Sequence, residues 1–175
     1  KITRFSGLSE DTYNFFKKVA GYDTLRMILC EKAILCEGDS DELVIQKAYM
    51  QLNDGRLPIE DGIEVISVGV SFLRFLEIAE CIHTKIAVVT DNDGDMKAIN
   101  KKYENYIGEN QKEYIKICVD EVVDTGTLKI GNRDYNYNTL EPKLLKVNGL
   151  ERLNRILGTD YTEEDDLRKY MKHNK

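Results

Sequence analysis

The sequence predicts an α/β fold: a parallel four-stranded sheet flanked by helices, with a C-terminal appendage made of a hairpin and helices. Three observations predict it. Short apolar runs alternate with helical patterns between residues 32 and 119, turn residues separate them, and the alternation stops after residue 120. Strands that alternate with helices of about 10–15 residues are typical of βαβ units, whose right-handed crossovers produce a parallel sheet.

The N-terminal segment, residues 1–31, is expected to be a helical lead-in. Ser9 is the expected N-cap of a first helix, and residues 22–29 form a second, shorter one. Apolar side chains of the first helix recur at helical spacing. They are Tyr13, Phe16, Val19 and Ala20.

Residues 32–123 form the predicted core. The expected strands span 32–36, 63–68, 85–90 and 114–119, and the expected helices span 40–53, 70–82 and 95–107. The helix 40–53 carries an apolar stripe that we expect to face the sheet. Its members are Leu43, Val44, Ala48 and Leu52.

Residues 124–175 form the predicted appendage. Two short runs, 127–130 and 133–136, flank Gly131-Asn132, a two-residue sequence typical of hairpin turns. A helix is expected to open at Thr139, with Pro142 in its first turn. The charged remainder, 148–175, is expected to be helical, with a helix start at 162–165.

The composition favours a soluble cytoplasmic protein. No apolar stretch approaches the ~18 residues that span a bilayer, and the N-terminus lacks the apolar core of a signal peptide. The four cysteines show neither a CxxC pair nor zinc-ligand spacing, so we expect free thiols in a reducing compartment. Because the chain lacks an initiator Met, we expect it to be a piece of a longer protein.

The net charge of −6 is unusual for a general nucleic-acid binder. It is compatible with a nuclease, since a metal centre itself concentrates carboxylates. A polyanion would then be held by metal ions, by local Lys/Arg patches, or by another part of the protein.

The first acidic motif, Glu37-Gly38-Asp39-Ser40-Asp41, follows the strand 32–36. Gly38 is expected to permit tight backbone geometry, and Ser40 to cap the next helix. A purely structural role in the first helical turn is sufficient for Asp39. It does not explain Glu37, which precedes the glycine at the strand end.

The second acidic motif, Asp91-Asn92-Asp93, follows the apolar run 86–90. On an extended segment Asp91 and Asp93 point to the same side, so they are expected to bind one cation or bridge two. The alternative is a polar turn that caps the next helix. An EF-hand loop is excluded, because Gly94 falls two positions too early and Lys102 stands at the twelfth position.

Both motifs are expected at the carboxyl edge of the sheet, where parallel α/β proteins bind ligands. Carboxylates about 4 Å apart repel by roughly 4 kcal/mol at an effective dielectric of about 20. A hard divalent cation such as magnesium, manganese or calcium relieves that repulsion. The order of the motifs resembles the Toprim fold of topoisomerases, primases and several nucleases, which has Glu-Gly after the first strand and Asp-x-Asp after the third.

The string Ile34-Leu35-Cys36-Glu37-Gly38-Asp39-Ser40-Asp41-Glu42 resembles more closely the overcoming-lysogenization-defect (OLD) family of ATP-dependent endonucleases. The resemblance covers roughly residues 20 to 175. The other matching segments are Tyr22–Arg26, Ser67–Gly69 with the helix that holds Phe72 and Phe75, Thr139–Glu141 and Tyr170–Lys175. Val70 departs from the second glycine that relatives often carry there.

The resemblance implies two-metal hydrolysis of DNA phosphodiesters with Mg²⁺ or Mn²⁺. Glu37 and Asp41 would bind one ion, and Asp91, Asp93 and Glu141 the other. Lys175, the last residue, would neutralise charge on the phosphate and complete a catalytic set with Glu37, Asp91 and Asp93. Gly38, Ser67 and Gly69 would contact the phosphate.

The family carries an ABC-type ATPase domain upstream. The chain has no GxxxxGK[ST] motif, so ATP would act only through that missing domain, which is also a possible site of homo-oligomerisation. Two other functions stay open: a Toprim scaffold that binds nucleic acid or a partner without cutting, and a phosphatase of the haloacid-dehalogenase type. His83 and His173 are expected to be surface residues rather than general bases.

Overall fold

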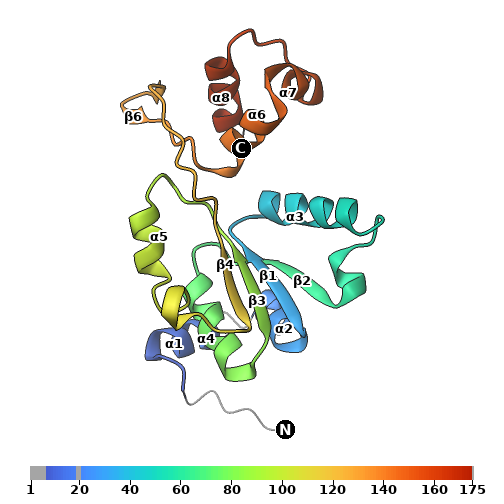
Figure 1. Cartoon of the computed structure of the whole chain (residues 1–175), viewed down its shortest axis with the longest axis vertical. Helices are drawn as coiled ribbons and strands as arrows, with labels where there is room; N and C mark the ends of the chain where they lie inside the picture. Colours follow the sequence, from blue (N-terminus) through green and yellow to red (C-terminus); the bar gives the residue numbers. More distant parts are fainter. Residues whose placement is uncertain (1–6, 19–20, 175) are drawn as a thin grey trace. The chain divides into compact units, whose positions relative to one another are not determined.

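A computed structural model describes residues 7–18 and 21–174 (Figure 1). The chain divides into two compact units, one made of residues 1–90 and 100–118 and the other of residues 91–99 and 119–175. Among the described helices, none has the length and apolar character needed to cross a membrane.

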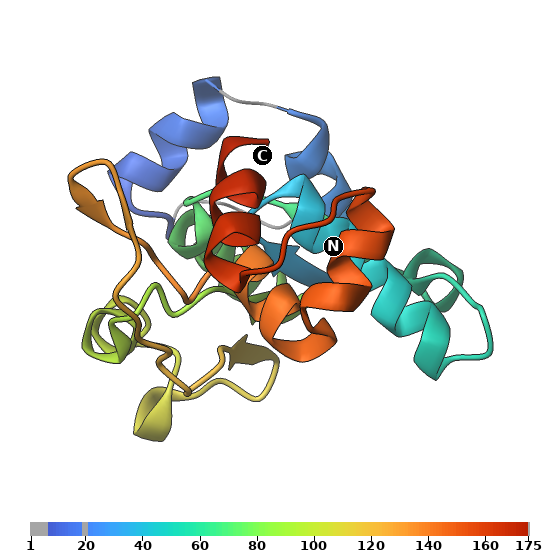
Figure 2. The same cartoon turned by 90° about the horizontal axis from the view of Figure 1, so that it is seen from above.

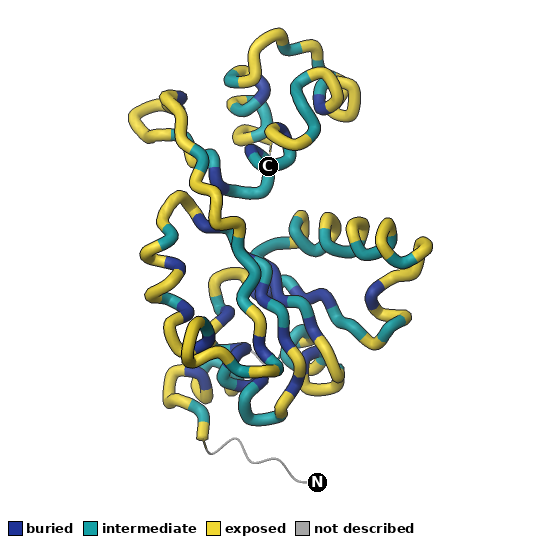
Figure 3. The backbone as a smooth tube through the Cα atoms, in the orientation of Figure 1, coloured by how far each residue is buried: buried dark blue, intermediate teal, exposed yellow. Residues whose placement is uncertain are grey.

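The first unit is built on a parallel sheet with strand order β2-β1-β3-β4, which confirms the predicted α/β class. Its strands are β1 (Lys32–Cys36), β2 (Ile63–Ser67), β3 (Lys85–Val89) and β4 (Ile115–Cys118). The burial pattern in Figure 3 shows the core running along this sheet. Because Cys36 pairs with Ser67 and Leu35 pairs with Val88, the residues that follow β1, β2 and β3 leave the same edge of the sheet.

The helices of the core follow the predicted order. They are α1 (Glu10–Lys18), α2 (Tyr22–Leu29), α3 (Asp39–Leu52), α4 (Phe72–Ile82) and α5 (Met96–Lys102), with a 3₁₀ turn at Pro58–Asp61 and another at Gly108–Asn110. Ser9 caps α1 as predicted, since its hydroxyl accepts a hydrogen bond from the Thr12 N–H. Val19 and Ala20 lie outside the described residues.

The prediction of a helix over 95–107 is too long, because α5 ends at Lys102. The next residue, Tyr103, is fully buried and its ring packs edge-on against Phe72 of α4 at 6.4 Å. Burial raises the pKa of the Tyr103 hydroxyl to about 12. The helix therefore ends where the buried Tyr103 side chain packs into the core, although the sequence pattern favours a further helical turn.

The predicted apolar stripe of α3 is exposed and does not face the sheet, so this prediction is wrong. Leu43 and Leu52 are 69% and 85% exposed, and no described residue of α3 is buried (Figure 3). The half-buried face is rotated from that stripe and carries Gln46 and Tyr49. Polar contacts hold it there: the Tyr49 hydroxyl donates to Asp61 at 2.7 Å, which fixes α3 against the 3₁₀ turn before β2.

We therefore expect Leu52→Lys to change the free energy of unfolding by less than about 0.5 kcal/mol, because an exposed side chain loses no packing. Chemical denaturation checks this value. The matched control is Leu76→Lys, which places a charge at a fully buried position of α4 and should prevent folding. A loss above about 1.5 kcal/mol for Leu52→Lys would show that the stripe packs against protein after all.

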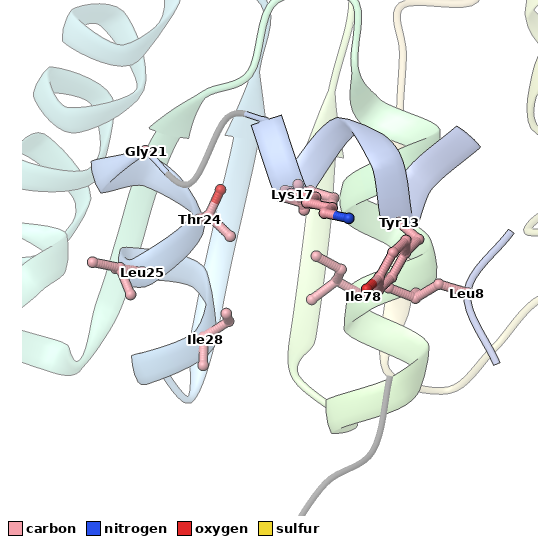
Figure 4. A pocket seen from close by; sticks show the side chains of 9 residues that line it. Leu8, Tyr13, Lys17, Gly21, Thr24, Leu25, Ile28 and Ile78 are labelled. Carbon is pink, nitrogen blue, oxygen red and sulfur yellow. The ribbon is translucent and has the colours of Figure 1, made fainter. Parts of the chain in front are cut away.

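An apolar pocket of about 380 Å³ lies between α1 and α2 (Figure 4). Tyr13 and Ile78 stand on one side of it, and Leu25 and Ile28 stand on the other. Its described walls are mainly aliphatic and aromatic, so it does not offer the oxygen ligands that a divalent cation needs.

All four cysteines are free thiols, as predicted. Cys36, the last residue of β1, is buried, and burial raises the pKa of its thiol to about 12. A thiol with so high a pKa is not a nucleophile near neutral pH.

The second unit contains the predicted hairpin, β5 (Lys129–Ile130) with β6 (Arg133–Asp134), followed by α6 (Leu140–Asn148), α7 (Leu150–Leu157) and α8 (Glu164–His173). The three helices pack side by side in Figure 2 around Leu145, Leu153 and Leu167. Pro142 lies in the first turn of α6 as expected. The division into segments 1–31, 32–123 and 124–175 stays a prediction.

Candidate metal centre

Glu37 is held at the carboxyl end of β1. The hydroxyl of Thr90, the residue after β3, donates to Glu37 Oε1 at 2.7 Å. Thr90 is buried and Glu37 is half-buried, so the carboxylate has a fixed anchor on one oxygen while it stays accessible. This contact joins the ends of two neighbouring strands, and spacing along the sequence did not indicate it.

Asp41 lies one helical turn beyond Glu37. Its Oδ2 accepts a hydrogen bond from the Gly38 N–H at 3.0 Å, which closes the start of α3. The N-cap is Gly38, so the prediction of Ser40 as cap is wrong: Ser40 is the second residue of the helix. Gly38 has an extended backbone with φ −141°, which any residue adopts, so the expected tight backbone geometry is not observed there.

Ser67 and Gly69 lie beside the backbone of Glu37. The Gly69 N–H donates to the Glu37 carbonyl at 3.1 Å, and the Ser67 hydroxyl donates to the same oxygen at 3.3 Å. Gly69 has φ +58°, a left-handed conformation that a glycine adopts without strain. Val70, which follows it, is 86% exposed. The structure thus brings five of the predicted site residues together at one edge of the first unit: Glu37, Gly38, Asp41, Ser67 and Gly69.

The second motif lies in the second unit and forms a turn. Asp93 has φ +49°, so the expectation that Asp91 and Asp93 alternate on an extended segment is wrong. The cause is the residue between them: Asn92 Oδ1 accepts a hydrogen bond from the Gly94 N–H at 2.8 Å, a local Asx turn.

Asn92 is 1% exposed and also anchors the turn to the loop that follows β4. Its Nδ2 donates to the carbonyls of Asp120 and Val122 at 2.6 and 3.0 Å. The middle residue of the motif is therefore the structural member, and its two neighbours are the acidic ones. An Asp-x-Asp pattern gives no sign of this division of roles.

Asp93 and Glu141 line one cavity of about 540 Å³ in the second unit. Asn136 Nδ2 donates to Asp93 Oδ1 at 2.9 Å, and the Thr139 hydroxyl contacts Glu141 Oε2 at 3.4 Å. Lys175 lies outside the described residues. His173 is exposed as predicted, and the cavity is lined by Asp93, Ile130, Arg133, Asp134, Tyr135, Asn136, Thr139, Glu141, Lys172 and His173.

Residues 28–93 match the family described as overcoming lysogenization defect protein-like, TOPRIM domain. This segment is similar to an OLD-like TOPRIM domain. It contains Glu37, Asp41, Asp91 and Asp93 but not Glu141. A search of curated proteins and a search of solved structures found no match. A TOPRIM domain indicates a function in nucleic-acid processing with metal binding.

The TOPRIM acids offer carboxylate oxygens, the donors that magnesium and manganese prefer. Among residues 7–18 and 21–174, however, the structure gathers no group of three or more His, Cys, Asp or Glu side chains. The chemistry of the donor set fits a hard divalent cation, while a complete coordination group is not preformed by the described side chains.

A charged cluster fixes the segment between β4 and α6. Lys143 Nζ lies 2.7 Å from both Asp120 and Asp124 and donates to the Val122 carbonyl. The hydrogen bond from Lys143 lowers the pKa of both carboxyls. Burial lowers the pKa of Lys143, but the two carboxylates raise it by more, so the net pKa is above its ordinary value. Lys143 is two residues from Glu141, so this cluster positions the first turn of α6.

We expect the second unit to lose stability in acid through this cluster. Because the pKa of Asp124 is lowered in the folded state, its contribution is present above about pH 4 and is lost as the pH falls through the folded pKa. Thermal unfolding between neutral pH and about pH 3 should show a smaller acid loss in Asp124→Asn than in wild type. Asp160→Asn, in an exposed loop, is the control, and equal acid loss in both variants would contradict the assignment.

Proposed function

We propose that the protein is a metal-dependent endonuclease that hydrolyses DNA phosphodiesters with two divalent cations, Mg²⁺ or Mn²⁺. One observation carries the proposal. Within the segment that matches the TOPRIM domain, Glu37 is anchored by Thr90 at the end of β3, and Asp91 is the next residue of the chain. Both acidic motifs therefore begin at strand ends that leave one edge of the sheet.

The proposal assigns the ligands as follows. Glu37 and Asp41 bind one ion, and Asp91, Asp93 and Glu141 bind the other. When bound, such ions supply positive charge to the phosphate and lower the pKa of a water molecule. The Glu37 carboxylate accepts a proton from the attacking water.

The remaining roles concern the phosphate. The backbone N–H groups around Gly38 and Gly69 and the Ser67 hydroxyl hold its oxygens. Lys175 neutralises the charge that develops on it. In the structure the Gly38 N–H donates to Asp41, and the Gly69 N–H and the Ser67 hydroxyl donate to the Glu37 carbonyl. Phosphate binding by these three groups therefore requires a change of partner.

The wider context is also proposed from the family. The full-length protein carries an ABC-type ATPase domain upstream, and ATP acts through that domain. The same domain supports homo-oligomerisation. The protein works in the cytoplasm.

A Toprim scaffold that binds nucleic acid without cutting is the second candidate. The observation that favours it is the lack of a gathered three-acid group among the described side chains. A haloacid-dehalogenase-type phosphatase is less favoured, because its nucleophilic Asp-x-Asp follows the first strand, whereas β1 here delivers Glu37.

The test is cleavage of supercoiled plasmid DNA by the protein with Mg²⁺ or Mn²⁺, beside a sample that contains a chelator. The nuclease proposal predicts nicked or linear product only with the metal, and no hydrolysis of p-nitrophenyl phosphate. DNA that is bound but never cut supports the scaffold, and hydrolysis of the phosphomonoester alone supports the phosphatase.

A further inference from the structure

The cavity of the second unit has cationic side chains on two of its walls. Arg133 comes from the hairpin strand β6, and Lys172 comes from the last turn of α8. Both side chains are exposed. The two residues are far apart in the sequence, and no motif contains both. They line the same cavity because the hairpin and α8 both border it.

These two cations differ from their neighbours. On α8, Arg168 pairs with Glu164 and Asp165, and Lys169 pairs with Asp166 at 2.8 Å. On the hairpin, Lys129 pairs with Asp134. Within the part of the chain that the structure describes, neither Arg133 nor Lys172 forms a salt bridge. Their charges remain available to a ligand.

The cavity also carries three acids, Asp93, Asp134 and Glu141. Asp134 already pairs with Lys129, and the other two carboxylates balance the two fixed cations, so the cavity as it stands has no excess positive charge to attract a phosphate. A divalent cation held by Asp93 and Glu141 reverses that balance. Phosphate binding at this position therefore depends on metal and on the two basic side chains together.

We propose that Arg133 and Lys172 bind the phosphodiester backbone of the nucleic acid next to the carboxylates Asp93 and Glu141, and that this binding requires a divalent cation. The inference rests on the proposed function and deepens it by naming the residues that position the substrate. It accounts for how a chain with a net charge of −6 holds a polyanion. The planar guanidinium of Arg133 suits bidentate contact with phosphate oxygens, and the ammonium of Lys172 acts as a point charge.

The test is binding of a short fluorescein-labelled DNA duplex, measured by anisotropy in Ca²⁺ over a range of salt concentrations. Arg133→Gln and Lys172→Gln should each weaken binding roughly tenfold and reduce the slope of log K against log [salt] by about 0.9. The controls, Arg155→Gln on α7 and Lys169→Gln on α8, remove an arginine and a lysine that do not line the cavity. Their DNA affinity should stay within about twofold of wild type. In a chelator, binding should be lost.

The inference fails if the wild-type protein does not bind the duplex in Ca²⁺, if the cavity variants and the controls weaken binding equally, or if the chelator has no effect. A plasmid cleavage assay on the same samples separates the two proposals. Cavity-dependent binding by a protein that does not cut keeps this inference and rejects the nuclease. Cutting that is unchanged in both cavity variants keeps the nuclease and rejects this inference.

Discussion

Glu37→Ala should lower metal-dependent DNA cleavage by at least a hundredfold, the largest effect we expect from any substitution. The side chain supplies a metal ligand and the proposed proton acceptor, and no other carboxylate follows β1 before α3 begins at Asp39. Initial rates of plasmid nicking in Mn²⁺ measure the effect.

Two further variants show whether the charge itself matters. Glu37→Gln keeps the length of the side chain and an oxygen that accepts from Thr90, yet a neutral amide is a weak metal ligand, so it should be as inactive as Glu37→Ala. Glu31→Ala changes an exposed glutamate at the other end of β1 and should keep full activity. Activity of Glu37→Gln within about threefold of wild type would remove Glu37 from the metal centre.

Asn92→Ala is the second large effect. It removes the acceptor for the Gly94 N–H and the donor for the carbonyls of Asp120 and Val122, all from a side chain that is 1% exposed. We expect a loss of about 1.5–3 kcal/mol in the free energy of unfolding, because three hydrogen bonds made by one buried side chain are lost together. Urea denaturation measures it.

The same substitution should also weaken Mn²⁺ binding roughly tenfold, since a residue that holds ligands in place supports metal affinity without touching the ion. Calorimetry on the folded variant measures this second readout. Asn100→Ala, on the exposed face of α5, is the matched control and should change neither quantity. A stability loss with unchanged Mn²⁺ affinity would make Asn92 a purely structural residue.

The sheet was predictable because each strand is a short apolar run with turn residues around it. Strand β1 was predicted at its observed bounds, β2 and β3 end one residue earlier than predicted, and β4 is one residue shorter at each end. The α3 stripe was not predictable in this way. Leu43 and Leu52 recur at near-helical spacing, yet polar anchors such as the Tyr49–Asp61 hydrogen bond turn that face to solvent. Periodicity locates an apolar face but does not say which face another element covers.

The acidic residues of the candidate site were predictable from their places after β1 and β3. The residues that hold these acidic side chains in place were not predictable. Thr90 contacts Glu37, Asn136 contacts Asp93, and Asn92 ties the second motif to the loop after β4. These contacts join distant segments, which a single sequence does not reveal. Arg133 and Lys172 are ordinary surface cations in the sequence, and only the folded hairpin and α8 place both on one cavity.

The central claim is that the two acidic motifs hold divalent cations, and manganese titration by calorimetry tests it most directly. The account predicts two Mn²⁺ sites in the wild-type protein. It predicts that Glu37→Ala and Asp91→Ala each remove one of them, while Glu31→Ala retains both. No Mn²⁺ binding by the folded wild-type protein, or binding that neither substitution changes, would contradict the claim.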